Sequence, residues 1–284
     1  MSLFSRSLVG LFALVVLPLS AQGAGAAGAQ PAPFVGHQAL YDLSLQKSRG
    51  NVSVNSARGR ILYNFTGSAC EGFSTDFRQV SELEVGEDRS ILSDLRSTTW
   101  EDADGKTYRF KVDTQTNDST TEVDGIAERS DKGITVKLKK PATKTFTIDG
   151  ATVFPTEQVR RIVEAAKDGK SLLELAVYDG SDDGEKVYNT LTVIGRAIPG
   201  DKAPATADAA SDNDALKAMT RWPVTVSYYD QKTKQQSGEQ TPVYAMSFEL
   251  YENGVSRALV LDYNDFVIAG AMSKFDLKPA KACK

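Results

Sequence analysis

The clearest strand pattern in the chain is YAMSFELYENGVSRALVLDYNDFVIAGAM, residues 244–272. Large apolar side chains occupy every second position of Tyr244–Leu250, which is the period of a half-buried strand. Asn253-Gly254 follows, and Asn-Gly is the strongest short signal for a β-hairpin. Two further apolar runs, 259–263 and 266–272, complete three consecutive strands. The stretch therefore predicts an antiparallel meander.

The same alternation recurs along most of the chain. Apolar residues alternate in 39–45, 61–65, 108–112 and 134–138. Asp and Gly, which favour tight reversals, occur together at Asp104-Gly105, Asp124-Gly125 and Asp131-Lys132-Gly133. These patterns predict a mainly β protein of about a dozen or more short antiparallel strands.

One main helix interrupts the strands. Val159, Ile162, Val163 and Ala166 have helical spacing, Thr156 is placed to cap the N-terminus, and Gly169 is placed to end the helix. In a protein made mostly of strands, this apolar stripe is expected to pack in or on the concave face of the sheet. The later stretch 199–214 has neither period and is expected to be an exposed loop.

The N-terminus has the features of a secretory signal peptide. Arg6 precedes the apolar run Leu8–Leu19, which is shorter than the roughly 20 residues that cross a bilayer, and small residues follow. We assign residues 1–26 to this peptide, with the cleavage point open between Ala21 and Ala29, and 27–284 to one domain. The mature protein is expected to be exported and soluble, and not to span a membrane.

Export changes the interpretation of the two cysteines, Cys70 and Cys283. In an oxidising compartment an even, minimal count predicts one disulfide. Neither cysteine belongs to a C-x-x-C pair, so a redox function is the weaker interpretation.

Composition and the single histidine limit the chemistry. The 284 residues carry 33 basic and 37 acidic side chains, and a net charge of -4 argues against nucleic-acid binding. His37 would have to serve any Ser-His-Asp or Cys-His site, yet it lies close to the expected mature N-terminus. One histidine and two distant cysteines do not suit a zinc site. We therefore expect no catalytic residue, no cofactor and no enzymatic activity.

A calcium loop is a weaker candidate. Asp179, Ser181 and Asp183 match loop positions 1, 3 and 5 of an EF-hand, and Gly184 matches the sharp turn. The twelfth position should be a glutamate and is Thr190, so a polar hairpin turn is the simpler interpretation.

Paired acids leave a hydrolase as the last alternative. Glu101 with Asp102, or Asp262 with Asp265, could flank a glycosidic bond. Acids are abundant in this chain, so such pairs also arise on solvated strands and turns.

Longer motifs resemble a known family. Arg221–Tyr229, Thr241–Tyr244 and Ser247–Arg257, together with the earlier Cys70–Phe73 and Tyr178–Gly184, are similar to the EipB-type cell-envelope integrity proteins of alphaproteobacteria. The resemblance implies a periplasmic protein with a broken, spiral-like β-barrel around a central helix, closed by a disulfide that matches Cys70 and Cys283. It also implies support of envelope integrity and stress resistance, no established enzymatic activity, and a link to a periplasmic tetratricopeptide-repeat protein.

These expectations combine into one leading hypothesis and two rivals. The leading hypothesis is a periplasmic, membrane-proximal protein that shelters a lipid or a lipidated peptide in its concave interior, by analogy with envelope carriers of similar fold. The first rival is a structural protein that docks the repeat protein without a ligand. The second is an envelope hydrolase that uses Asp262 and Asp265.

Overall fold

The computed structural model describes residues 34–49, 54–232 and 240–279. The predicted signal peptide, residues 1–26, lies outside these residues, and so does Cys283. The described part forms a single antiparallel sheet of 14 strands and two helices. The strands are β1 (His37–Ser48), β2 (Val54–Ser68), β3 (Gly72–Val85), β4 (Arg89–Glu101), β5 (Thr107–Thr116), β6 (Ser119–Ser130), β7 (Gly133–Lys140), β8 (Lys144–Ile148), β9 (Leu172–Val177), β10 (Tyr188–Ile194), β11 (Arg221–Asp230), β12 (Tyr244–Tyr251), β13 (Ser256–Asp262) and β14 (Phe266–Leu277).

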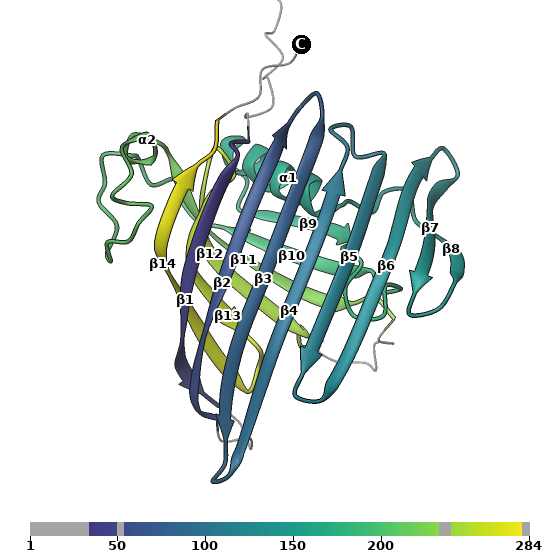
Figure 1. Cartoon of the computed structure of the whole chain (residues 1–284). Helices are drawn as coiled ribbons and strands as arrows, with labels where there is room; N and C mark the ends of the chain where they lie inside the picture. Colours follow the sequence, from purple (N-terminus) through teal and green to yellow (C-terminus); the bar gives the residue numbers. More distant parts are fainter. Residues whose placement is uncertain (1–33, 50–53, 233–239, 280–284) are drawn as a thin grey trace, which may run out of the picture. The chain divides into compact units, whose positions relative to one another are not determined.

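Two meanders meet at β1. Strands β1 to β8 pair in sequence order, as do β9 to β14, and β14 pairs with β1 to join the two halves. His37 faces Phe65 of β2 on one side and Leu277 of β14 on the other. The sheet is not closed, because β8 and β9 are its two ends (Figure 1). The predicted mainly β fold, a curled and broken antiparallel barrel, is confirmed.

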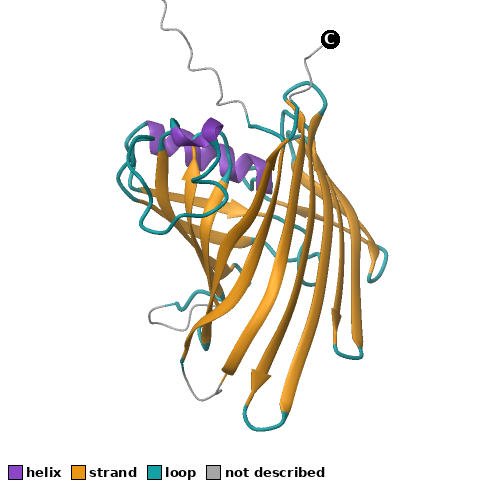
Figure 2. Cartoon of the chain, turned by 60° about the vertical axis from the view of Figure 1, so that its left-hand side comes forward, coloured by secondary structure: helices purple, strands orange, loops and turns teal. Residues whose placement is uncertain are grey.

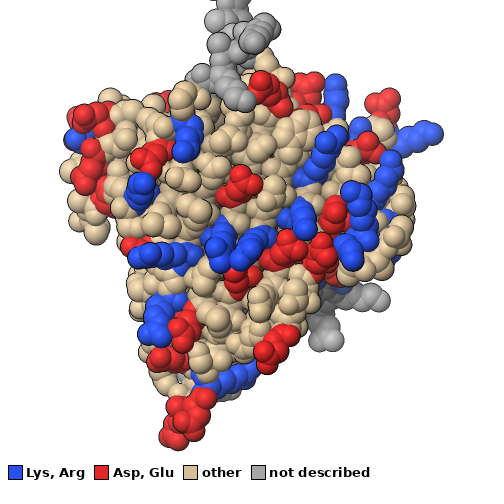
Figure 3. Space-filling view, viewed as in Figure 1, with Lys and Arg blue, Asp and Glu red and all other residues tan. Residues whose placement is uncertain are grey.

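Strand alternation separates the interior from the outer face. Ala39, Tyr41 and Leu43 of β1 are buried, whereas Asp42 between them is partly exposed and pairs with Arg60 at 2.8 Å. Positive and negative side chains are interleaved over the outer face of β1 to β6 (Figure 3). Several strands are longer than expected, since β2 has 15 residues and β3 has 14.

Gly125 corrects one turn assignment. The sequence pattern placed a reversal at Asp124-Gly125, but Gly125 lies inside β6 opposite Phe110 of β5. A Cβ atom at Gly125 would lie 2.6 Å from the Phe110 ring and 3.0 Å from Leu138. The glycine is therefore needed for side-chain packing across the sheet, while the real turn is at Asp131-Lys132, as predicted.

The main helix, α1 (Pro155–Lys167), connects β8 to β9, the two ends of the open sheet. Its buried residues include Ile162, Val163 and Ala166, as the spacing predicts. They pack with Trp222 of β11 and Leu250 of β12. The helices lie toward one end of the curled sheet (Figure 2). The second, α2 (Asp214–Lys217), is a single turn that follows the long loop.

The segment after β9 fills part of the space beside the break. Gly180 and Gly184 both have positive φ and approach the other half of the sheet. A Cβ at Gly180 would lie 2.3 Å from Phe110, and one at Gly184 would lie 2.8 Å from Val123. Tyr178 belongs to the same buried cluster. Asp179 and Ser181 of the same segment line a space that is left unfilled beside the first turn of α1.

Candidate functional site

A cavity of about 390 Å³ lies inside the curled sheet, between the first turn of α1 and the inner faces of β1 to β5. Its volume is in the range of about 300–1,000 Å³ that small-molecule pockets occupy. Most of its exposed lining is apolar. The apolar lining includes Phe34, Tyr63, Phe65, Phe77, Leu95 and Met246.

Aromatic rings form one wall of the cavity. The ring of Phe65 stacks on Phe73, with centroids 5.4 Å apart, and Phe34 meets Phe65 edge-on at 6.1 Å. These rings come from β2, β3 and the segment before β1, which the β1–β2 and β2–β3 registers bring together. Packed rings hold the wall in place, because each ring has few alternative rotamers once its neighbours are fixed.

His37 is part of this wall. It is 2% exposed, its Nδ1 hydrogen-bonds the Val35 carbonyl oxygen at 2.9 Å, and its ring packs against Tyr63 at 5.5 Å and Phe275 at 5.8 Å. Burial lowers the pKa of His37, which favours the uncharged ring. The histidine therefore contributes an uncharged ring to an aromatic wall.

The end of the cavity beside the start of α1 and the segment after β9 is polar. His37 aside, its polar lining includes Thr99, Tyr108, Thr156, Asp179 and Ser181. The Tyr108 hydroxyl donates to the Asp179 carbonyl oxygen at 2.9 Å, which ties β5 to the segment after β9. Burial raises the pKa of Asp179.

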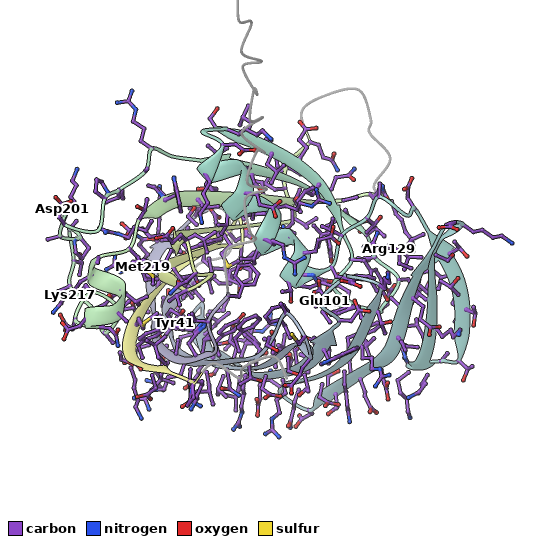
Figure 4. The ribbon with its side chains drawn as sticks, turned by 90° about the horizontal axis from the view of Figure 1, so that it is seen from above. Tyr41, Glu101, Arg129, Asp201, Lys217 and Met219 are labelled. Atoms are coloured by element: carbon purple, nitrogen blue, oxygen red, sulfur yellow. The ribbon has the colours of Figure 1, made fainter. Side chains whose placement is uncertain are left out.

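Glu101 caps α1, which corrects the predicted role of Thr156. The N-cap residue is Phe154, whose side chain makes no capping hydrogen bond. Instead, the backbone N–H groups of Thr156 and Glu157 donate to the two carboxylate oxygens of Glu101, at 2.8 and 2.9 Å. A carboxylate from β4 thus satisfies donors that a helix start leaves unpaired, and its charge suits the positive end of the helix. Seen from above, Glu101 lies inside the curve of the sheet beside α1 (Figure 4).

The pKa of Glu101 gives a pH-dependent prediction. Burial raises this pKa to about 7, although hydrogen bonds from Thr156 and Glu157 oppose the shift. The native state then binds the proton more tightly than the unfolded state, so the contribution of Glu101 to stability is present below pH 4.5 and is lost as pH rises to about 7. Glu101→Gln cannot titrate. From pH 4.5 to 8 the wild type should lose about 2–3 kcal/mol of unfolding free energy relative to this variant.

Urea unfolding of both proteins across this pH range measures the difference. Taking the difference cancels the titration of His37 and Asp179, which both proteins share. A gap between the two proteins that stays constant with pH would contradict the raised pKa.

The three candidate calcium ligands do not point to one site. Asp179 and Ser181 line the cavity, and the Asp179 carboxylate accepts the Ser181 N–H at 2.9 Å. Asp183 is exposed and accepts the N–H of Glu185 at 2.9 Å instead. No group of three or more His, Cys, Asp or Glu side chains is placed to hold a metal ion in the described part of the chain. The loop has the hydrogen bonds of a polar turn, and calcium binding stays a prediction that titration calorimetry can test.

The paired acids do not converge on the cavity. Glu101 is bound to α1, whereas Asp102 accepts the Lys106 N–H in the β4–β5 turn. Asp262 pairs with Arg49 at 2.8 Å on the surface, at the turn that contains Asp265. Cys70 lies in the β2–β3 turn, and its predicted partner Cys283 falls outside the described residues.

Sequence reasoning predicted a concave interior but not which residues line a cavity in it, and it missed the link between Glu101 and α1. Alternation is the same for side chains that line a cavity and for those that fill a core. In the sequence Glu101 is distinguished only by its neighbour Asp102, and 55 positions separate it from Thr156. One local signal was available: Glu101 occupies an inward position of β4, where a charged side chain needs a partner.

A family model described as EipB-like matches residues 28–279. The chain belongs to the EipB-like family. The cell envelope integrity protein EipB of Brucella abortus (strain 2308) is 37% identical over 258 residues, which cover 89% of this chain and 88% of that protein. The crystal structure of a beta-barrel-like protein of the domain of unknown function DUF1849, also from Brucella abortus, matches with a TM-score of 0.77. It is 32% identical, and the match covers 87% of this chain and 99% of that one. No described helix is long and apolar enough to cross a bilayer.

Proposed function

We propose that this protein is a non-enzymatic periplasmic protein that supports cell-envelope integrity and stress resistance by sheltering one apolar chain of a lipid or lipidated peptide. The name of its Brucella relative supports the envelope role. The observation that carries the binding role is the apolar cavity inside the curled sheet. Each methylene group that moves from water into such a space contributes about 0.8 kcal/mol.

A cavity-filling variant tests this function. Ser97 on β4 lines the cavity, and its register partners Phe77 and Val112 line it too. Ser97→Trp should place an indole in the space that the ligand needs. We expect it to weaken binding of 1-N-phenylnaphthylamine, an uncharged fluorophore, at least tenfold.

The neighbouring residue gives the matched control. Thr98 is exposed on the outer face of the same strand, so Thr98→Trp adds the same side chain outside the cavity. This control should bind the fluorophore as the wild type does, and both variants should keep the wild-type circular dichroism spectrum. Native mass spectrometry of gently purified protein should also show a bound acyl species. No fluorophore uptake by the wild type, or equal binding by both variants, would refute the proposal.

The docking alternative gives a different result in cells. A protein that only docks a periplasmic repeat protein does not need the cavity, so Ser97→Trp should then preserve resistance to envelope stress. Under the binding function, the same variant should lose that resistance while Thr98→Trp keeps it.

A further inference from the structure

We propose that the cavity accepts a chain whose head group is uncharged and forms hydrogen bonds, such as an amide or a hydroxyl, and that it rejects a free carboxylate or phosphate. This inference rests on the proposed binding function and specifies its ligand class. It follows from the charges and the hydrogen-bond donors at the polar end of the cavity.

The described lining offers no positive charge. It contains no lysine or arginine, and its only acidic residue is Asp179. His37 is buried among aromatic rings, where the uncharged ring is favoured. An anionic head group would lose its hydration without gaining a counter-ion, and that costs several kcal/mol.

The start of α1 cannot replace a positive side chain. A helix N-terminus attracts anions through its free N–H groups and its dipole. Here Pro155 has no N–H, while those of Thr156 and Glu157 are both taken by Glu101. The next, Gln158 N–H, donates to the Phe154 carbonyl oxygen at 2.8 Å. Glu101 already occupies the place of an anionic ligand.

The arginines near this end are held elsewhere. Arg129 donates to the carbonyl oxygens of Gly105 and Gly150, pairs with Glu157 at 3.1 Å, and lies over the Phe154 ring. Arg160 donates to the carbonyl oxygen of Ala103 at 3.4 Å. Neither arginine lines the cavity. The other polar side chains at this end of the lining carry hydroxyls, such as those of Thr99 and Ser181, and a hydroxyl both donates and accepts hydrogen bonds, which suits an uncharged partner.

Ligands with the same twelve-carbon chain test the preference. Dodecanol, dodecanamide and dodecanoate should be compared by displacement of 1-N-phenylnaphthylamine from the mature protein at pH 7.5, below their micelle concentrations. We expect dodecanol and dodecanamide to bind at least tenfold more tightly than dodecanoate. The gap should narrow at pH 5, where part of the dodecanoate is protonated.

A pair of variants tests the location of the effect. Asp179→Asn removes the one acidic group of the lining, and dodecanoate should then gain at least threefold in affinity relative to dodecanol. Asp183→Asn removes an exposed carboxylate from the same loop and should leave the ratio as in the wild type. Equal ratios in the wild type and Asp179→Asn would overturn the assignment of the selectivity to this end of the cavity.

The outcomes separate the two proposals. Dodecanoate binding as tightly as dodecanol, or more tightly, would overturn the head-group preference and leave the binding function standing. Failure of all three ligands to displace the fluorophore would overturn both.

Discussion

Replacing Arg257 with methionine should lower the free energy of unfolding by about 3–5 kcal/mol, because it leaves the buried carboxylate of Asp208 without its ion-pair partner. The Arg257 side chain is 3% exposed, and its Nε atom lies 2.9 Å from Asp208, whose side chain is 7% exposed. It also pairs with Glu249 and donates to the Thr206 carbonyl oxygen at 2.7 Å. These bonds fix the long loop before α2 against β12 and β13.

Urea unfolding monitored by circular dichroism measures this loss. The matched control is Arg58→Met, which removes an arginine from an exposed pair with Glu82 and should cost at most about 1 kcal/mol. Adding Asp208→Leu to Arg257→Met should recover part of the lost stability, since the stranded charge is then removed as well. Equal effects of Arg257→Met and Arg58→Met would show that the buried network does not stabilise the fold as described.

Local patterns predicted the elements of this fold, and contacts distant in sequence determined the site. The Asn253-Gly254 hairpin is contained in a few neighbouring residues, so alternation and turn chemistry were enough to find it. Arg257 and Asp208 are 49 positions apart, and no local pattern shows that they meet.

Glycine and helix-capping signals show the same limit. Gly125 has the sequence of a turn, but its position opposite the Phe110 ring gives it a packing role inside β6. Thr156 is a residue type that caps helices, but the N–H groups at the start of α1 are bound by the carboxylate of Glu101, from a strand distant in sequence. In each case a tertiary contact replaced the local preference that the sequence displays.

The pairing of β1 with β2 and β14 supports the predicted disulfide. Phe65 and Leu277 both face His37, so the ends of β2 and β14 lie one strand to either side of β1. The chain continues beside the start of β1 after β14 ends, since the Lys278 N–H donates to the Gly36 carbonyl oxygen at 2.8 Å. The β2–β3 turn, which carries Cys70, is at the same end of the sheet as the end of β14 (Figure 1). Two strand spacings amount to about 10 Å, and a few extended residues cover that distance. We therefore propose a Cys70–Cys283 disulfide, a clasp that would join the β2–β3 turn to the chain after β14 across β1.

Loss of this disulfide should have the other large effect. The bond would close a loop of 213 positions, from 70 to 283. The chain-entropy model gives such a loop about 5 kcal/mol of stabilisation, less any strain in the native state. Cys70→Ser, or reduction of the wild type with dithiothreitol, should therefore lower the urea midpoint strongly. If the β1–β14 contacts form late in folding, they are absent from the transition state. The loss of stability should then appear mainly as faster unfolding rather than slower folding.

The Cys70→Ser variant also controls for unspecific effects of the reductant. Dithiothreitol should shift the midpoint of the wild type and leave that of Cys70→Ser unchanged. Mass spectrometry of an unreduced digest should show the peptides of Cys70 and Cys283 linked. Two free thiols in the mature, unreduced protein, or a wild-type midpoint that does not respond to reduction, would exclude the clasp. The junction of the two meanders would then be held by the β1–β14 pairing and its side chains alone.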